Sequence, residues 1–423
     1  MKKDMEELRC EIDRVPVIDT HEHLLPEGWI SEKKPDNSLI IRKRNEEEKV
    51  NLSFILNNSY CGWEPREAVL ENWDSLKEFL NKVRGRAFYR SLFKALQKLY
   101  DFTPSDINEQ NWKELSRRIN VANNKKGWQK EILKDKANID LIIWDQFWEM
   151  GNTRVDREIF RPIFRIDPLL VGYNRKICTH DGISPYPYAE KLKFKIQSFD
   201  DYLDFITFAI EKNKNEGCVG IKCAIAYERS IDFQPVEKEE ARGVFGLSED
   251  HLSDRAKKAF GDYIMHFIVE RAIKYDLPIQ IHTGLAKLEG SNPMNLIGLI
   301  SRYPKAKFVL FHGGYPWTSQ ISAIAFTYRN VYLDLVWLPI LSPEVAVRTL
   351  HEWIEIVDAD RITWGGDCWT AEEAYGALLT ARDVVTRVLA EKIEKGYLSQ
   401  EAAYDIAWKI FRNNAIEIYN LKS

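Results

Sequence analysis

The stretch that decides the fold is VPVIDTHEH, residues 15–23. It begins as an apolar run and ends in two histidines that are separated by a single residue. Apolar runs without strict alternation are typical of parallel strands that are buried on both faces. Because alternate side chains of a strand point to the same face, we expect His21 and His23 to lie side by side where this strand ends.

Seven more short runs rich in Val, Ile and Phe are also predicted to be strands. They occupy residues 139–147, 161–167, 218–227, 277–284, 306–314, 331–337 and 362–367. Helical segments with serine caps separate the later strands, at residues 199–214, 254–275, 343–357 and 401–419. Eight strands that alternate with helices predict an α/β protein with the (β/α)8 TIM barrel fold. Between the second and third predicted strands, the chain is long enough for a short helix at most. Residues 370–373, TAEE, have the form of a capping box.

A long charged and aromatic segment, residues 24–138, follows the first strand. Its pattern is helical at residues 65–80, 87–100 and 112–120. We therefore expect a barrel over residues 11–423 that contains a helical insertion over residues 31–138. Loops that leave the C-terminal ends of barrel strands lie over the active site, so the insertion is expected to form a lid or a pocket wall.

The composition is that of a folded protein, since 45% of the 423 residues are hydrophobic and the net charge is −4. Scattered charges of both signs argue against a nucleic-acid partner, and we expect a small-molecule substrate. No run approaches the ~18 apolar residues of a membrane span, and the N-terminus lacks the apolar core of a signal peptide. Six cysteines without a C-x-x-C pair predict reduced thiols and a cytoplasmic protein. The oligomeric state is open, with a homo-oligomer among the options.

Three other predicted strands end in residues that can bind a metal ion. His282 ends PIQIH, His312 ends FVLFH and Asp367 ends ITWGGD. Glycines lie close to each of them, which lets the backbone and a bound ion approach closely. Imidazole nitrogens and carboxylate oxygens on one rim suit a divalent ion such as Zn²⁺. The sequence therefore predicts a metal centre at the barrel mouth.

Lys222, in GCVGIKCAIAY, lies in the middle of a predicted strand. A lysine there must be paired, desolvated or modified. If carbamylated, it would bridge two metal ions, and if unmodified, it would bind a carboxylate of the substrate. A structural lysine with a buried stem is the third alternative.

The combined pattern is similar to that of the amidohydrolase superfamily: H-x-H on strand one, lysine on strand four, histidines on strands five and six, and aspartate on strand eight. The phrases VGIKCAIAYERS, SNPMNLIGLISRYP and FVLFHGGYPW most resemble the amidohydrolase-related barrels that are sometimes fused to a glutamine-synthetase-like domain. The resemblance covers residues 14–30 and about 139–420. It implies a metal-dependent barrel with one or two divalent ions, of which zinc is favoured and manganese is the other option.

The resemblance also implies four metal ligands, namely His21, His23, His282 and Asp367. Asp367 would act as the catalytic base, His312 would bind the carbonyl oxygen or a second metal ion, and Lys222 would complete the catalytic set. The implied reaction is metal-dependent hydrolysis of a C–N, amide-like bond in a small carboxylated substrate. Uronate isomerases and metal-dependent decarboxylases of the same superfamily provide the alternative reaction.

Loop residues that follow the strands are expected to contact the substrate. The predicted set is Tyr227, Glu228 and Arg229 after strand four, Tyr315 and Trp317 after strand six, and Trp369 after strand eight. His180, in a loop after strand three, is a further candidate. For Arg84, Arg86 and Arg90 in the insertion, a solvated helix face is favoured over contact with an anionic substrate.

Overall fold

The computed structural model describes residues 2–33, 39–45, 47–62 and 72–422. Its contacts divide the chain into two compact units, each assembled from three segments. Unit 1 comprises Met1–Ile142, Trp337–Leu350 and Trp364–Phe411, and unit 2 comprises Ile143–Val336, His351–Thr363 and Arg412–Ser423. None of the helices in the described residues is both long and apolar enough to cross a membrane.

Strands are present at all eight predicted positions, and each is shorter than the apolar run that predicted it. The third position is divided at Ile163 into two short strands. In chain order the strands are β1 (Val17–Glu22), β4 (Ile139–Trp144), β5 (Phe160–Pro162) with β6 (Phe164–Arg165), β7 (Ile221–Cys223), β8 (Ile279–Ile281), β9 (Phe308–Leu310), β10 (Val331–Asp334) and β11 (Ile362–Thr363). All residues of β1, β8 and β9 are buried, as expected for parallel strands covered on both faces.

In unit 2, six parallel strands form one sheet in the order β11-β10-β9-β8-β7-β6. Neighbouring strands pair near their starts, with Ile279 of β8 opposite both Ile221 of β7 and Phe308 of β9. The strands therefore end at a common edge, where His282 follows β8 directly and His312 follows β9 after Phe311. This arrangement follows from the predicted β/α alternation.

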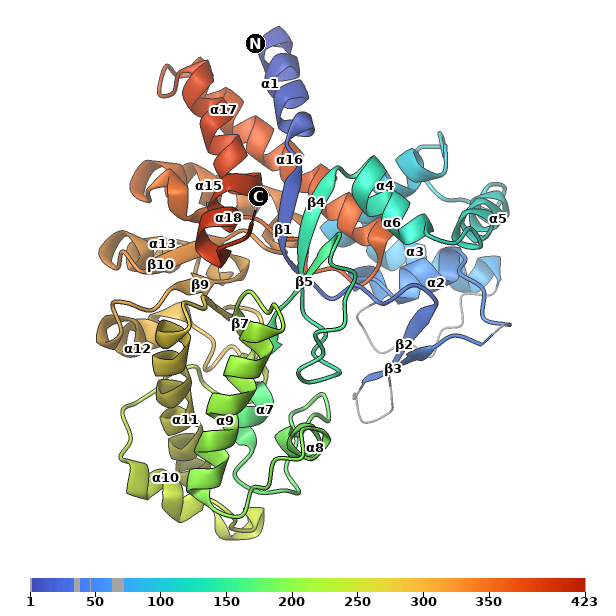
Figure 1. Cartoon of the computed structure of the whole chain (residues 1–423). Helices are drawn as coiled ribbons and strands as arrows, with labels where there is room; N and C mark the ends of the chain where they lie inside the picture. The colour runs from blue at the N-terminus through green and yellow to red at the C-terminus, as the bar shows by residue number, and fades with distance from the viewer. Residues whose placement is uncertain (1, 34–38, 46, 63–71, 423) are drawn as a thin grey trace. The chain divides into compact units, whose positions relative to one another are not determined.

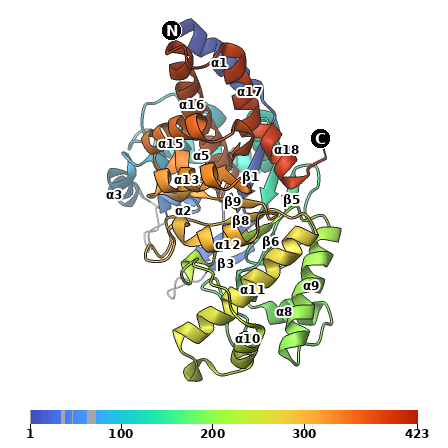
Figure 2. The ribbon, with the colours of Figure 1, turned by 90° about the vertical axis from the view of Figure 1, so that its left-hand side faces the viewer.

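The helices of unit 2 confirm the two long helical predictions. Helix α9 (Phe199–Asn215) begins with a complete capping box between Ser198 and Asp201, and α11 (Asp254–Lys274) is capped by Ser253. These two helices pack together, as Figure 2 shows. The shorter helices are α7 (Asp167–Val171), α8 (Pro185–Lys191), α10 (Lys238–Val244), α12 (Ile297–Arg302), α13 (Thr318–Thr327) and α18 (Asn414–Tyr419). Single 3-10 turns are η3 (Ile225–Tyr227), η4 (Glu249–His251), η5 (Pro293–Leu296), η6 (His312–Gly314) and η7 (Ala359–Arg361).

In unit 1, the segment after β1 begins with an antiparallel hairpin of β2 (Trp29–Lys33) and β3 (Leu39–Lys43). We had expected only helices in this insertion, but isoleucines at positions 30, 40 and 41 favour strands. The helical part consists of α2 (Leu52–Asn57), η1 (Tyr60–Gly62), α3 (Trp73–Val83), α4 (Ala87–Leu99), α5 (Trp112–Asn123), α6 (Trp128–Glu131) and the π-helical turn η2 (Ile132–Lys136). The first predicted helix, 65–80, overlaps α3, and its residues 65–71 lie outside the described part of the chain.

The remaining helices of unit 1 are α1 (Lys2–Arg14), α14 (Leu338–Leu341), α16 (Ala371–Glu394) and α17 (Gln400–Trp408). Helix α15 (Pro343–Ile356) and the π-helical turn η8 (Lys409–Asn413) contribute residues to both units. The single predicted helix over residues 401–419 is thus divided into α17, η8 and α18. Figure 1 shows α16 running past α1 and α4, its two main packing partners.

Helix α16 approaches α4 closely at Gly376, where a side chain would not fit. A Cβ at this position would lie 2.5 Å from the carbonyl oxygen of Ser91 and 2.9 Å from its carbonyl carbon. Because these are backbone atoms, neither helix can relieve the overlap by rotating a side chain. The α4–α16 contact therefore requires glycine at position 376.

We expect Gly376→Ala to destabilise the protein by about 1–3 kcal/mol, because overpacking forces the two helices apart. The measurement is the midpoint of thermal or denaturant unfolding. Gly298→Ala in α12 is the matched control, because a Cβ there meets no atom within 4 Å, and it should be neutral or slightly stabilising. Equal unfolding midpoints for the two variants would contradict the packing argument.

Candidate metal centre and surrounding groups

Two segments far apart in the sequence are held side by side in unit 1 by backbone hydrogen bonds. The Thr20 N–H donates to Trp364 O (3.2 Å), and the Asp367 N–H donates to His21 O (2.8 Å). Further along, the N–H groups of His23 and Leu25 donate to Cys368 O (3.0 Å) and Trp369 O (2.9 Å). Residues 20–25 and 364–369 therefore run together, which brings the H-x-H motif next to Asp367.

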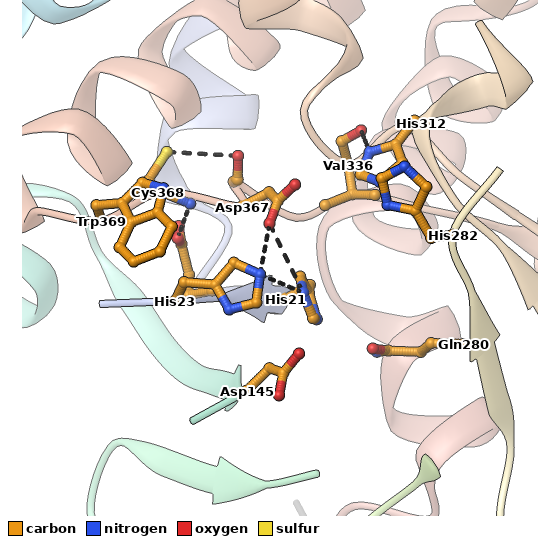
Figure 3. Close-up of polar contacts among 12 residues, drawn as sticks. His21, His23, Asp145, Gln280, His282, His312, Val336, Asp367, Cys368 and Trp369 are labelled. Atoms are coloured by element: carbon orange, nitrogen blue, oxygen red, sulfur yellow. Dashed lines mark hydrogen bonds and ion pairs between the residues drawn. The ribbon is translucent and has the colours of Figure 1, made fainter. Parts of the chain in front are cut away.

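The side chains of His21, His23 and Asp367 form a compact cluster. The Asp367 Oδ1 atom lies 3.2 Å from His23 Nε2 and 3.6 Å from His21 Nε2, and the two Nε2 atoms are 3.3 Å apart. Figure 3 shows both rings turned toward the Asp367 carboxylate. His21 is fully buried, while His23 and Asp367 are slightly exposed.

These distances match what a bound ion requires. Ligand atoms at ~2.0–2.1 Å from a tetrahedral zinc ion lie roughly 3.4 Å from one another, and the three observed separations are 3.2, 3.3 and 3.6 Å. Two imidazoles and a carboxylate are also the donor types that catalytic zinc sites use. The three residues could thus hold a divalent ion and leave one coordination position open.

Glycine at positions 365 and 366 makes this approach of the two segments feasible. A Cβ at Gly365 would lie 2.7 Å from Thr20 Oγ1 and 2.8 Å from the backbone nitrogen of His21. A Cβ at Gly366 would lie 2.1 Å from Glu22 Oε1. The Glu22 carboxyl therefore fills the space that a side chain at 366 would need, and it accepts a hydrogen bond from the Cys368 N–H. Burial and the nearby Asp19 carboxylate raise the pKa of Glu22 well above its usual value.

His282 and His312 form a second histidine pair, which belongs to unit 2. His312 Nε2 lies 2.9 Å from His282 Nδ1. The other nitrogen of each ring faces a backbone carbonyl oxygen. His282 Nε2 lies 2.8 Å from Leu285 O, and His312 Nδ1 lies 3.3 Å from Val336 O. A neutral imidazole has one N–H, and a contact with a carbonyl oxygen requires that N–H. If both outer nitrogens donate to carbonyls, the two nitrogens that face each other both carry lone pairs, which repel unless a cation lies between them. A separation of 2.9 Å suits a shared proton better than two ligands of one zinc ion. The assignment of His282 as a metal ligand stays a prediction.

Lys222 lies in β7 of unit 2 and is buried, with 2% of its surface exposed. Its Nζ lies 3.6 Å from the centre of the Phe311 ring, which is a cation–π arrangement. This contact fits an unmodified ammonium group, as two of the three alternatives for this residue require.

A chain of polar and aromatic rings in unit 2 includes two predicted site residues, Tyr227 and His180. The Tyr227 ring lies 4.6 Å from the His282 ring and 5.3 Å from the His180 ring. His180 Nδ1 lies 2.8 Å from Glu228 Oε1, and its Nε2 lies 3.2 Å from Asp181. Burial opposes the charged form of His180, but these two carboxylates raise its pKa overall. Glu228, which directly follows Tyr227, was predicted with it as a substrate-facing residue, and that role stays a prediction.

Arg229 is held within unit 2 by a structural contact. Its Nη1 pairs with the buried Asp262 of α11 at 2.8 Å, and its guanidinium lies 5.1 Å from the Phe233 ring centre. Tyr315 and Trp317 are half-buried in the loop that follows η6. The roles of these three residues in binding a substrate remain predictions.

A buried ion network in unit 2 was missed by the sequence reasoning. Arg165 of β6 donates to the carboxylates of Asp145 and Asp167, and Asp167 also accepts from the Ala224 N–H at 2.7 Å. Burial would lower the pKa of Arg165, but the two carboxylates raise it overall. An arginine in the apolar run RPIFRID was the only local signal, because a buried arginine requires partners.

The loop after Asp367 is tied to the insertion within unit 1. The Trp369 ring lies 5.6 Å from the His23 ring (Figure 3). The buried Glu373 accepts hydrogen bonds from the Trp369 N–H (3.1 Å) and from the Tyr60 N–H (2.7 Å) of η1. Only half of the predicted capping box forms: Thr370 Oγ1 accepts from the Glu373 N–H, but the Glu373 side chain turns to Trp369 and Tyr60.

Loss of the H-x-H pair should remove the metal ion. We expect wild-type protein to carry about one zinc or manganese ion in this cluster and the double variant His21→Ala/His23→Ala to lose it, as measured by elemental analysis after dialysis. His251→Ala, which changes an exposed histidine in η4, is the control and should keep the metal. Full metal content in the double variant would disprove the site.

Glu373 should make stability depend on pH. Burial raises its pKa to about 8, although the two backbone N–H donors act in the opposite direction. A carboxyl with a raised pKa contributes most to stability below its unfolded-state value, and this contribution is lost as the pH rises toward 8. Relative to Glu373→Gln, wild type should therefore lose about 2–5 kcal/mol between pH 5 and pH 9.

The measurement is the unfolding midpoint of both proteins across this pH range. Glu394→Gln, at an exposed position near the end of the same helix, serves as the control and should follow wild type. A constant difference between wild type and Glu373→Gln at all pH values would show that the carboxyl does not titrate in this range.

Comparison with known proteins identifies related sequences. Residues 236–421 match the family model described as amidohydrolase. The sequence is 26% identical to protein fluG of Emericella nidulans over 317 residues, which are 70% of this chain and 36% of that protein. The chain thus spans about a third of the length of the curated relative that it matches.

Solved structures share the fold over nearly the whole chain. A structure from Lactobacillus casei, described as that of a metal-dependent hydrolase, is 17% identical with a TM-score of 0.67 and covers 98% of this chain and 97% of that one. Glucuronate isomerase from Caulobacter crescentus is 16% identical with a TM-score of 0.74, covering 100% of this chain and 95% of that one. At such identities the likeness shows the fold alone, the predicted (β/α)8 TIM barrel. The chain thus shares this fold over nearly its whole length, and residues 236–421 match the amidohydrolase family model.

Proposed function

We propose that the chain is a metal-dependent hydrolase that cleaves a C–N, amide-like bond in a small carboxylated substrate. The observation that carries the proposal is the cluster of His21, His23 and Asp367, whose donor atoms lie 3.2–3.6 Å apart. Three protein ligands are the number that catalytic zinc sites use, because the fourth position must accept water or substrate.

When bound there, a divalent ion would polarise a carbonyl group and acidify a water molecule. The residues of the chain would supply the proton transfer and the exclusion of water that the hydrolysis also requires. Asp367 would accept a proton from the attacking water and return it to the leaving nitrogen. The Trp369 ring, which is 7% exposed and lies beside His23, shields this part of the site from bulk water.

His312 remains the proposed partner of the substrate's carbonyl oxygen. An N–H of His312 would donate to the developing oxyanion in place of its present contact with His282 Nδ1 at 2.9 Å or with Val336 O at 3.3 Å. Neither residue needs to bind a metal ion for this role. Tyr227, whose ring packs on His282, would orient that donor.

Isomerisation or decarboxylation of a carboxylated sugar acid is the second candidate, and the position of Lys222 favours it. A lysine carbamate that bridges two metal ions would support hydrolysis, whereas an unmodified Lys222 ammonium group beside the Phe311 ring would bind the carboxylate of a sugar acid. Assays of zinc- and manganese-loaded protein against amide and uronate libraries separate the two reactions. Turnover of uronates alone would overturn the hydrolase assignment.

Asp367→Asn should abolish most of the activity without unfolding the protein. Asparagine keeps the shape and the backbone bond to His21, but it cannot accept the proton, so kcat should fall about 100- to 10,000-fold. The measurement is kcat on a substrate found by the screen, together with metal content and melting temperature. Asp360→Asn, at an exposed position before β11, is the control. A folded, metal-loaded Asp367→Asn protein with near-normal kcat would exclude Asp367 as the base.

A further inference from the structure

A pocket lies in unit 1 between the insertion and the start of α16. Its walls include the aromatic side chains of Trp29, Phe54 and Trp369, together with Arg44 and Glu372. We call it the Arg44 pocket. Its mixture of apolar walls with a few polar groups is typical of small-molecule sites.

Arg44 offers an unused hydrogen-bond donor to this pocket. Its Nη1 donates to the carbonyl oxygen of Glu48 at 2.9 Å, but its Nε is buried and has no partner among the described residues. The Glu48 carboxylate pairs with Arg42 instead, at 2.6 Å. The guanidinium edge formed by Nε–H and the adjacent Nη–H is the one that binds a carboxylate with two parallel hydrogen bonds.

Glu372 supplies a negative charge in the same pocket. Its side chain is 3% exposed, and Oε1 accepts hydrogen bonds from Tyr100 Oη (2.6 Å) and Asn123 Nδ2 (3.2 Å). Burial and the Glu372 carboxylate raise the pKa of Tyr100 well above its usual value, so the phenol stays a donor. These donors orient the carboxylate, whose other oxygen, Oε2, would interact with a cationic group of the ligand.

The pocket shares a wall with the metal cluster. Trp369 lines the pocket, and its ring lies 5.6 Å from the His23 ring. Leu25, another lining residue, is two positions after His23 and donates its N–H to Trp369 O at 2.9 Å. A substrate whose reactive bond lies at His23 could therefore extend past Trp369 into the pocket.

We propose that the Arg44 pocket binds the zwitterionic, amino-acid end of the substrate. Arg44 would bind its carboxylate, Glu372 its ammonium group, and the aromatic walls its aliphatic chain. This inference rests on the proposed function and narrows the substrate class to amides that carry a free amino-acid group.

The test uses three six-carbon probes on the full zinc-loaded chain: L-norleucine with both charges, hexanoate with the carboxylate alone, and hexylamine with the ammonium alone. Isothermal titration calorimetry should show L-norleucine binding at least about 10-fold more tightly than either of the others. Arg44→Met should weaken L-norleucine and hexanoate binding about 10- to 100-fold and leave hexylamine unchanged. Glu372→Gln should weaken L-norleucine and hexylamine binding and leave hexanoate unchanged. Arg44→Lys, which keeps the charge but not the planar fork, should lie between wild type and Arg44→Met.

Lys43→Met, which removes an exposed positive charge next to Arg44, is the matched control and should bind all three probes as wild type does. Binding to His21→Ala/His23→Ala should persist, which excludes chelation of zinc by the amino acid. Melting temperatures establish that each variant is folded. Equal affinities for L-norleucine and hexanoate, or an unchanged affinity in Arg44→Met, would overturn the proposal.

The outcomes separate the pocket from the reaction. If amides are hydrolysed but L-norleucine does not bind, the pocket assignment fails and the proposed function stands. If L-norleucine binds through Arg44 and Glu372 but no amide is hydrolysed, the pocket stands and the hydrolase assignment fails.

Discussion

The candidate centre depends on one constraint, the parallel pairing of residues 20–25 with residues 364–369. Four backbone hydrogen bonds hold these segments together, and glycine at 365 and 366 allows them to approach. Without this pairing, His21 and His23 would share one strand face but have no carboxylate between them. The same pairing sets the wall of the Arg44 pocket, because Leu25 and Trp369 are joined by its last hydrogen bond.

Much of the fold and of the candidate centre could be predicted, because both depend on the local pattern of apolar and polar residues. The eight apolar runs marked the strands, and the H-x-H spacing placed both imidazoles on one face by the two-residue period of a strand. Asp367 could be recognised because it ends an apolar run after two glycines. The likeness to solved barrels over nearly the whole chain agrees with that pattern. Strand lengths were overestimated, since apolar residues continue into the loops that bury the ends of short strands.

Other groups could not be predicted, because they meet across long distances in sequence. Glu373 has the spacing of a capping residue, but Tyr60, which is not in its local sequence, competes for its carboxyl. Arg229 was predicted to contact the substrate, and its ion pair with Asp262 of α11 has no signal in the local sequence. Arg44 and Glu372 carry no motif and come together only in the pocket. In each case the sequence shows a charged residue, but its partner depends on packing.

The loop that carries Asp367 shows how the chain can hold a ligand in place before an ion binds. Asp367 has φ of 62°, a left-handed conformation that costs a non-glycine residue of order 1 kcal/mol or more. Three consecutive N–H groups fix it: that of Asp367 donates to His21 O, that of Cys368 to Glu22 and that of Trp369 to Glu373. Both acceptor carboxyls are buried, and burial raises the pKa of each. The residue between the two histidines therefore also has a role, since Glu22 orients the loop after strand eight while His21 and His23 face the Asp367 carboxylate. Such preorganisation, supported by a surrounding layer of hydrogen bonds, is what a metal centre needs to keep its geometry.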